Sequence, residues 1–453
     1  MPRRFAALRS FCLVALAAAL AACAGAPPPA APAPRPGPAL RSVVLMLDGV
    51  PYPVMDSLVR AGHFRGFAPP ARMVSPFPSL TGVAFRDIWR EPLSPGYEDL
   101  YFDPERNELR GGALDHFFGG DAEPGFHRHV EVAGSSLVTS MAYLLPAPFA
   151  KRELAELRSG ILKRAETDSA IVAYLVSTDA IAHRGGREPL VETVLGVEAM
   201  VDELRSRYPG VRIDLLSDHG NDLVPTRPVE LLAALKAAGF HPSGHLRRPD
   251  DVVVPRFGLV GSVAVYADPA SAPRLAASLA GLEGVDLVVH EDEAGRIHVA
   301  GPAGRAVIEA DAALARFRYT PESGDPLGLA PALARLRAGG ALDASGFAAD
   351  SSWLRESEST PYLDGLRRIV LGLRGAVRNP AAVLVSLAPG YHFGSAAATR
   401  VVQVTGTHGS LRTTSSSAFY TSTAAAPPAL LRSDELLPLL PAAVRAPAPR
   451  RAP

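Results

Sequence analysis

The sequence predicts an α/β fold in which a mostly parallel central sheet carries helices on both faces, with a small α+β insertion. Three observations carry this prediction. Short runs rich in Val, Leu and Ile have the length and composition of strands that are buried on both faces. Stretches with the apolar spacing of helices alternate with these runs, which is typical of parallel sheets. The alternation changes near residue 241 and resumes near residue 341.

The first part of the pattern predicts three strands and three helices. Pro189 is compatible with the first turn of its helix, and Gly239 is suited to closing the last helix. In chain order the expected elements are a strand over Ser42–Leu47, a helix over Glu153–Ala165, a strand over Ala170–Val176, a helix over Pro189–Tyr208, a strand over Val211–Leu216 and a helix over Val229–Ala238.

The middle of the chain has a different order of elements and is expected to be an insertion. It reads as a strand over Gly261–Ala267, a helix over Pro273–Leu279 and strands over Val285–His290 and Ile297–Ala300. The first pattern then returns with a helix over Pro361–Leu373, a strand over Ala382–Leu387 and a short helix starting near Ser433. The predicted division is a catalytic core in two parts, 41–240 and 341–440, with a cap-like α+β region over 241–340 that would select the substrate.

Residues 1–23 are expected to form a bacterial lipoprotein signal peptide. Arg3 and Arg4 give the chain a basic start, and the apolar stretch Phe11–Leu20 that comes later is too short to cross a bilayer comfortably. Leu20-Ala21-Ala22-Cys23 resembles a lipobox, in which Cys23 would become the lipid anchor. An ordinary cleavage site of the Ala-x-Ala type is the alternative. Ala24 after the cysteine, in place of an Asp, favours the outer membrane, with the protein in the cell envelope facing the periplasm.

Pro- and Ala-rich stretches border the predicted core. Residues 24–40 would be an extended tether and residues 441–453 a disordered tail. The formal net charge is zero, which leaves no electrostatic footprint for nucleic acid, so no duplex binding is expected. The two cysteines are Cys12, inside the signal, and Cys23. The mature chain beyond its anchor therefore has no disulfide, no cysteine metal ligand and no cysteine nucleophile.

Five short segments carry the carboxylates, imidazoles and hydroxyl that two divalent cations and a nucleophile need. Three of the five directly follow an apolar run. Because ligands collect at the carboxyl ends of parallel strands, the carboxylates would meet at one sheet edge, where their repulsion would favour bound cations. The segments are Asp48-Gly49, Pro78-Ser79-Leu80-Thr81, Asp179-Ala180-Ile181-Ala182-His183, Asp218-His219-Gly220 and His408-Gly409.

Each segment alone has a simpler interpretation. Asp48-Gly49 is also a common strand-ending turn, and Asp218-His219-Gly220 is compatible with a turn and helix cap. Asp179 could cap a helix that leaves His183 on its exposed side, and His408 could lie in a plain loop. The presence of all five segments, in this order, is what favours a site.

Taken together, the five segments resemble the signatures of the alkaline phosphatase superfamily, and within it the nucleotide pyrophosphatase/phosphodiesterase branch. The resemblance covers roughly residues 41–240 and 350–435. It implies an alkaline phosphatase-like fold and a metal-dependent hydrolase of phosphate esters, best described as a phosphodiesterase. The substrate would be a small-molecule, lipid or glycan phosphate ester, and the membrane would be contacted through the lipid anchor.

The same resemblance assigns the site residues. One Zn²⁺ ion would be bound by Asp179, His183 and His408, and a second by Asp48, Asp218, His219 and the Thr81 oxygen. Mixed carboxylate and imidazole ligands suit zinc, although other divalent cations are compatible. Thr81 would be the nucleophile, and its attack on phosphorus would give a covalent phospho-threonine.

The chain departs from this branch where an Asn usually helps to hold a phosphoryl oxygen. Phe85-Arg86-Asp87-Ile88-Trp89 follows the nucleophile instead, and Asn107 is the only Asn in the vicinity. Arg86 or backbone amides near Gly82 are the alternative donors, so the preference for diesters or monoesters stays open. The alternative functions are those of a phosphomonoesterase, phosphonate hydrolase or sulfatase of the same superfamily. A non-catalytic envelope binding protein is a further alternative.

Overall fold

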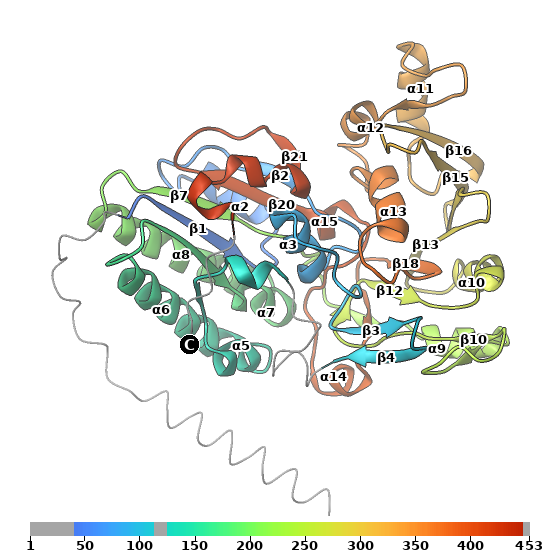
Figure 1. Ribbon diagram of the computed structural model, residues 1–453, viewed down its shortest axis with the longest axis horizontal. Helices are drawn as coiled ribbons and strands as arrows, with labels where there is room; N and C mark the ends of the chain where they lie inside the picture. Colours follow the sequence, from blue (N-terminus) through green and yellow to red (C-terminus); the bar gives the residue numbers. More distant parts are fainter. Residues whose placement is uncertain (1–39, 113–124, 447–453) are drawn as a thin grey trace, which may run out of the picture. The chain divides into compact units, whose positions relative to one another are not determined.

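The structure is a computed structural model that describes residues 40–112 and 125–446 (Figure 1). The predicted signal peptide with Cys23 and nearly all of the tether lie outside the described residues, as does the end of the predicted tail from residue 447. Within the described ranges, no helix combines the length and apolar character that crossing a bilayer requires.

The first of two large sheets has seven strands in the order β21-β2-β20-β7-β1-β6-β5. β1 (Ser42–Leu47) is an inner strand and pairs in parallel with β6 (Ala170–Leu175) on one side and β7 (Arg212–Leu216) on the other. Only β20 runs against its neighbours. The remaining strands are β2 (Ala71–Val74), β5 (Val132–Ala133), β20 (Ser417–Ser422) and β21 (Leu430–Arg432). The predicted mostly parallel sheet is confirmed.

Helical segments cover both faces of this sheet, as predicted. Alternate side chains of β1 point to opposite faces, so that Val43 and Leu45 join one core and Val44 and Met46 join the other. The first core contains the apolar sides of α2 (Tyr52–Arg60), α6 (Pro146–Arg164) and α8 (Arg187–Arg207). The second core contains apolar residues of α3 (Thr81–Trp89) and of the C-terminal 3₁₀ helices η4 (Leu437–Leu439) and η5 (Ala442–Val444). Leu436, which follows the 3₁₀ helix η3 (Ser433–Glu435), also belongs to this core.

The structure contradicts the first part of the predicted tail. The Pro and Ala content of residues 441–453 predicts a disordered tail. Ala442–Val444 instead forms η5, and Val444 is buried in the second core of the first sheet. One apolar anchor in a Pro/Ala-rich segment is enough to order it, and composition alone does not reveal that anchor.

A second seven-stranded sheet is antiparallel throughout, with the order β12-β18-β13-β14-β15-β16-β17. β18 (Val383–Leu387), expected to return to the first pattern, pairs instead with β12 (Ser262–Val265) and β13 (Val285–Glu291). The other strands are β14 (Ile297–Gly301), β15 (Gly304–Ala310), β16 (Arg316–Gly324) and β17 (Ala348–Ala349). Residues from both sides of the predicted boundary at 340 therefore build this sheet.

Helices pack on both faces of the second sheet. α9 (Leu231–Ala237) and α10 (Ala272–Leu279) share one core with β12 and β18. α13 (Gly365–Arg374), together with α11 (Ala330–Ala338) and α12 (Asp350–Glu356), belongs to the other core. That second core also contains Phe77 and Leu80 from the loop before α3, so it reaches the segment that carries Thr81.

Short elements complete the described chain. They are β3 (Leu100–Asp103), β4 (Glu108–Gly111), η1 (Gly125–His129), α5 (Ser136–Ala142), α7 (Ser177–Arg184), β8 (Arg227–Pro228), β9 (His241–Pro242), β10 (Asp251–Val252), β11 (Leu259–Val260), η2 (Pro269–Ser271), β19 (Tyr391–Gly394), α14 (Ala396–Val401) and α15 (Thr413–Ser416).

Candidate metal centre

Three carboxylates lie at the carboxyl edge of the first sheet. Asp48 directly follows β1, and Asp179 and Asp218 follow the neighbouring strands β6 and β7. Because β1 pairs in parallel with both neighbours, the three strands end at the same edge, which is where open α/β sheets bind ligands. All three side chains are almost completely buried.

The first cluster contains Asp179, His183 and His408. Asp179 and His183 are four residues apart on α7, so they share one face of that helix, and His183 Nε2 lies 3.4 Å from Asp179 Oδ2. His408 comes from the loop between α14 and α15 and places its Nε2 atom 3.7 Å from Asp179 Oδ1. The structure thus brings three possible metal ligands together, although Asp179 and His408 are 229 residues apart in the sequence.

The second cluster contains Asp48, Asp218 and His219. His219 Nε2 lies 3.2 Å from Asp218 Oδ2 and 3.5 Å from Asp48 Oδ1. Thr81 begins α3 and points its hydroxyl into this cluster, where Oγ1 lies 3.3 Å from Asp48 Oδ1 and 3.2 Å from His219 Nε2. All seven residues singled out in the sequence therefore gather at one place, in the two groups that the resemblance implied.

The two clusters share a wall. The imidazole rings of His219 and His408, one from each cluster, stack with their centroids 3.7 Å apart. Gly49 fits between the clusters because it has no side chain. A Cβ atom at this position would lie 2.6 Å from Asp179 Oδ1, and its φ of +64° is itself unfavourable for other residues. Its amide donates to Asp218 Oδ1 at 3.0 Å.

The hydrogen bonds of two histidines leave one nitrogen of each facing a carboxylate. His219 Nδ1 donates to the Gly220 carbonyl and His408 Nδ1 donates to the Ser79 carbonyl, both at 2.8 Å. With the proton on Nδ1, each Nε2 atom carries a lone pair. These lone pairs face Asp218 Oδ2 and Asp179 Oδ1, two buried oxygens that accept no hydrogen bond. Facing lone pairs repel unless a proton or a metal ion lies between them, and the donor atoms of each cluster lie close enough together to hold a metal ion.

The electrostatics of the site lead to the same conclusion. Burial, together with the carboxylates of Asp218 and Asp179, raises the pKa of Asp48 well above its ordinary value. Burial also raises the pKa of Asp218, although His219 opposes the effect. Burial lowers the pKa of His408 well below its ordinary value, with His219 adding to the shift. A neutral imidazole is the form that binds metals, and cations would relieve the repulsion between the carboxylates.

Two tyrosines belong to the site and were missed in the sequence. The hydroxyl of Tyr174, on β6 opposite Met46, donates to Asp48 Oδ2. Tyr143 follows α5, donates to Asp179 Oδ2 at 2.9 Å and is 40% exposed at the surface of the first cluster. Tyr174 sits in an apolar strand pattern and Tyr143 in a stretch without a motif, so neither carried a recognisable signal.

The two side chains considered as phosphoryl donors lie elsewhere. Arg86 donates to the Glu91 carbonyl and pairs with Asp87. Asn107 bonds with the backbone of Leu246 through both ends of its amide. The amides of the first turn of α3, starting at Thr81, remain as donors at the site, because the first amides of a helix have no partner within it.

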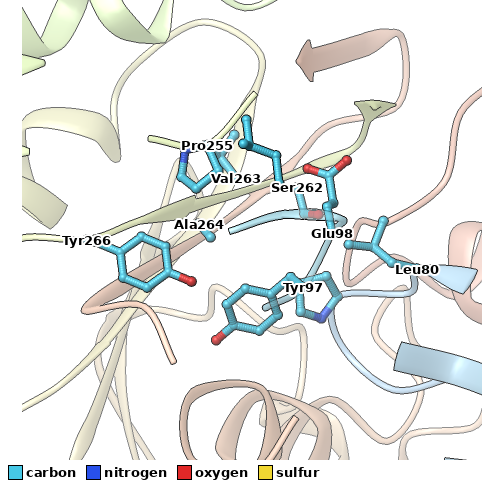
Figure 2. Close-up of a pocket in the computed structure, with 10 residues that line it drawn as sticks. Leu80, Tyr97, Glu98, Pro255, Ser262, Val263, Ala264 and Tyr266 are labelled. Atoms are coloured by element: carbon cyan, nitrogen blue, oxygen red, sulfur yellow. The ribbon is translucent and has the colours of Figure 1, made fainter. Parts of the chain in front are cut away.

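A pocket adjoins the loop that carries Thr81 (Figure 2). Its empty volume is about 350 Å³, including solvent at its mouth, and Pro78 and Leu80 form part of its wall. Glu98 brings a carboxylate to an otherwise mostly apolar lining, and it accepts a hydrogen bond from the Gly258 amide at 2.7 Å. Burial raises the pKa of Glu98 to about 7. The other lining residues are Tyr97, Leu100, Pro255, Ser262, Val263, Ala264 and Tyr266.

Comparisons with known proteins give structural similarity only. No protein-family model matches the chain, and no curated protein sequence matches it either. Among solved structures, the chain is similar to the mouse and human forms of ectonucleotide pyrophosphatase/phosphodiesterase 5, each with 11% identity and a TM-score of 0.44. An inactive variant of the mouse protein in complex with AMP gives 10% identity and a TM-score of 0.45. Each match covers 91% of this chain and 97% of the other chain.

Proposed function

We propose that this chain is a two-zinc phosphoric ester hydrolase, of the phosphodiesterase or nucleotide pyrophosphatase type, with Thr81 as its nucleophile. One observation carries the proposal. Two buried clusters, each with three side chains that could bind a metal, lie side by side. Among the described residues, two hydroxyls form hydrogen bonds with the second cluster. One belongs to Tyr174, which lies behind Asp48, and the other belongs to Thr81. The proposed substrate is a small phosphate ester, and its phosphorus atom would lie next to the Thr81 hydroxyl.

The donor set favours zinc at both positions. Two aspartates and a histidine, or one aspartate and two histidines, supply the mixed oxygen and nitrogen ligands that zinc accepts. Bound metal ions would supply charge stabilisation to the attacking and leaving oxygens and would lower the pKa of the Thr81 hydroxyl. Asp179, His183 and His408 would hold one ion, and Asp48, Asp218, His219 and Thr81 the other.

The protein's own groups would hold and activate the nucleophile. The Thr81 hydroxyl lies within reach of Asp48 Oδ1 and His219 Nε2, two acceptors that fix its direction. Thr81 Oγ1 would bond to phosphorus as the bond from phosphorus to the leaving oxygen breaks. The hydroxyl proton would pass to solvent, and the leaving oxygen would take up a proton from solvent. Water would then cleave the phospho-threonine and restore the hydroxyl.

The first turn of α3 would bind a phosphoryl oxygen. Thr81 is the first residue of this nine-residue helix, so the free amides of the first turn and the positive end of the helix dipole lie beside the nucleophile. This arrangement takes over the role for which Arg86 and Asn107 were considered. It depends on backbone groups alone, which explains why no side-chain motif after Thr81 marks it in the sequence.

The proposal is tested with purified residues 24–453 and three variants. The protein should contain about two zinc ions per chain and hydrolyse an aryl phosphodiester. Thr81→Ala should abolish turnover with zinc retained, and Thr81→Ser should keep part of it because the hydroxyl remains. Thr193→Ala is the matched control, since this hydroxyl bonds only within α8. Absence of hydrolysis across phosphodiesters, monoesters and phosphonates, with zinc supplied, would refute the proposal.

The same substrate panel separates the alternative reactions. A sulfatase would prefer the sulfate ester to the matching phosphate ester. Cys12 and Cys23 are the only cysteines, so no cysteine-derived sulfatase nucleophile is available in the core. Thr81 as nucleophile therefore predicts a preference for phosphate over sulfate esters of the same alcohol.

We also propose that the protein is attached to the cell envelope through a lipid on Cys23, in the outer membrane facing the periplasm. The support is the segment Leu20-Ala21-Ala22-Cys23 after an apolar stretch, with Ala24 following. Metabolic labelling with a fatty acid in a bacterial host should mark the wild-type chain. Labelling of Cys23→Ser to the same extent would contradict the proposed anchor.

A further inference from the structure

A buried arginine lies between the two loops that complete the metal centre. Arg368 comes from α13, which packs on the second sheet, and its side chain is almost completely buried. We call Ser75–Leu80, which leads to Thr81, the nucleophile loop, and Gly406–Arg412, which carries His408, the histidine loop.

The Arg368 guanidinium donates hydrogen bonds to both loops at once. On the nucleophile loop, Nε donates to the Ser75 carbonyl at 2.8 Å, and Nη2 donates to the Ser79 hydroxyl at 3.1 Å and the Pro76 carbonyl at 3.4 Å. On the histidine loop, Nη1 donates to the Leu411 carbonyl at 2.7 Å. A fifth bond, to the Leu363 carbonyl at 3.2 Å, ties the group to the segment just before its own helix.

The loops are joined to each other directly beside this guanidinium. His408 Nδ1 donates to the Ser79 carbonyl at 2.8 Å, and the Ser79 amide donates to the Gly409 carbonyl at 3.3 Å. Ser79 therefore contacts both the arginine and a metal-binding histidine, and it stands two residues before Thr81. A shift of either loop would move a ligand of one cluster relative to the other.

The charge of Arg368 has no carboxylate partner among the described residues. The nearby Asp364 carboxylate is bonded by Arg432 instead, at 2.7 and 2.8 Å. Burial lowers the pKa of Arg368 to about 9, with Asp364 opposing the shift, so the group stays protonated near neutral pH. Carbonyl dipoles of the two loops thus stabilise a buried cation, and the loops must keep their places for that stabilisation to persist.

We propose that Arg368 is a positioning residue that sets the spacing between the two metal clusters, and through it the rate of attack by Thr81. The inference rests on the proposed two-metal function. Arg368 touches neither cluster itself. It acts through the Ser79 hydroxyl, the Ser75 and Pro76 carbonyls and the Leu411 carbonyl, which place Thr81 and His408. A planar group with five donors suits this task better than an ammonium group.

The test compares three variants with a buried arginine that serves the fold alone. Arg368→Met removes the donors, Arg368→Lys keeps the charge on a single centre, and Ser79→Ala removes one partner while leaving the arginine in place. Arg432→Met is the control, because this buried arginine bonds Asp350 and Asp364 and contacts neither loop through its side chain. Circular dichroism and the midpoint of thermal unfolding report folding for each.

The main readout is the metal pair itself, measured without turnover. The metal-free protein is loaded with two equivalents of Co²⁺, and electron paramagnetic resonance records the coupling between the ions. We expect the Arg368 and Ser79 variants to bind two ions with altered coupling, and kcat on an aryl phosphodiester to fall about a hundredfold for Arg368→Met with KM little changed. Arg432→Met should lower the unfolding midpoint and keep the wild-type coupling and kcat.

The outcomes separate this inference from the proposed function. Wild-type coupling and kcat in the Arg368 variants, or changes no larger than those of Arg432→Met, would overturn the positioning role. If Arg368→Met does not fold, Arg368→Lys and Ser79→Ala decide by the same criteria. A wild-type protein that binds two cobalt ions without hydrolysing any ester would refute the function and leave the coupling measurement decisive. A wild-type protein that binds no cobalt would overturn both.

Discussion

At the scale of single residues, we expect the side chains behind the proposed metal ligands to matter as much as the ligands themselves. Tyr174 is buried on β6, and its hydroxyl donates a hydrogen bond to Asp48 Oδ2. The other oxygen of this carboxylate, Oδ1, is the one that lies near His219 of the second cluster. Groups that bond a ligating carboxylate hold it in place for the metal. The motifs of the sequence identified Asp48, but a tyrosine within a strand pattern gave no sign of this role.

Loss of the Tyr174 hydroxyl should weaken metal binding at the second cluster. Tyr174→Phe keeps the ring packing and removes the donor to Asp48, so we expect the zinc affinity to fall about 10- to 100-fold. Competition with a chromophoric chelator measures the affinity. Tyr420→Phe is the matched control, because this buried hydroxyl in the same sheet bonds Asp214 and not a cluster residue. Equal zinc affinity for Tyr174→Phe and wild type would contradict the expectation.

The Glu98 carboxyl should make stability depend on pH. Burial raises its folded pKa to about 7, above the ordinary value of 4.5. The contribution of the Glu98 carboxyl to the free energy of unfolding is therefore fully present below about pH 4.5 and is lost as the pH rises through about 7. The change in stability is on the order of 3 kcal/mol. Glu98→Gln should be more stable than wild type at about pH 8, and the difference should vanish toward about pH 4.5.

Urea unfolding at the two pH values measures this difference. Glu108→Gln is the control, since Glu108 is an exposed residue on the hairpin strand β4. If the stability of Glu98→Gln relative to wild type does not change between the two pH values, the pKa of the Glu98 carboxyl is not raised in the folded protein.

At the scale of elements, one helix-to-helix contact places the first cluster. Glu153 on α6 is completely buried, and its carboxylate accepts the amides of Val176 and Ser177 at 3.0 and 2.8 Å. These amides open α7, which carries Asp179 and His183. A carboxylate at the amino end of a helix satisfies amides that have no partner within the helix and interacts favourably with its dipole.

Removing this carboxylate should destabilise the fold and loosen the first cluster. Glu153→Ala leaves the amides of Val176 and Ser177 without this partner, which costs about 1–3 kcal/mol for the buried Ser177 amide and less for the partly buried Val176 amide. Glu153→Gln keeps one acceptor oxygen and should lose less. Chemical unfolding measures the free energy, and zinc titration measures the cluster. Equal losses for the alanine and glutamine variants would contradict the role of the carboxylate oxygens as acceptors.

The elements that sequence reasoning found share a strong pattern, and those it missed lack one. β1 matches its predicted bounds, Ser42–Leu47, because an apolar run follows a Pro/Ala-rich stretch and ends at Asp48-Gly49. α3 was not predicted, since Gly82 and the mixed residues after it give weak helical preference. α6 begins at Pro146, earlier than the predicted Glu153, because Pro-Ala-Pro resembles a loop although proline suits a first turn.

At the scale of the whole molecule, residues far apart in the chain close the site. β18 belongs to the second sheet, although local apolar pattern suggested a return to the first, because strand pairing depends on distant partners such as β12. The residues of the two clusters could be predicted because their order and spacing form motifs. Arg368, Tyr174 and Glu153 could not, since each acts through contacts that appear only when α13, β6 and α6 are in place.

Metal removal should lower the stability of the entire fold. Asp48, Asp179 and Asp218 lie together in a buried site, so without cations their repulsion opposes folding. Ligand binding to the folded state alone adds about 2.7 kcal/mol at a free concentration 100 times the dissociation constant. Dialysis against a chelator should lower the unfolding midpoint, and added zinc should restore it. An unchanged midpoint would argue against resident metal ions.

The most direct test of the proposed two-metal centre is a crystal structure of zinc-loaded protein with anomalous data collected on both sides of the zinc absorption edge. The structure predicts two strong peaks, one among Asp179, His183 and His408 and one among Asp48, Asp218, His219 and Thr81. No peak at these clusters with zinc in excess, or a peak at only one of them, would contradict the account.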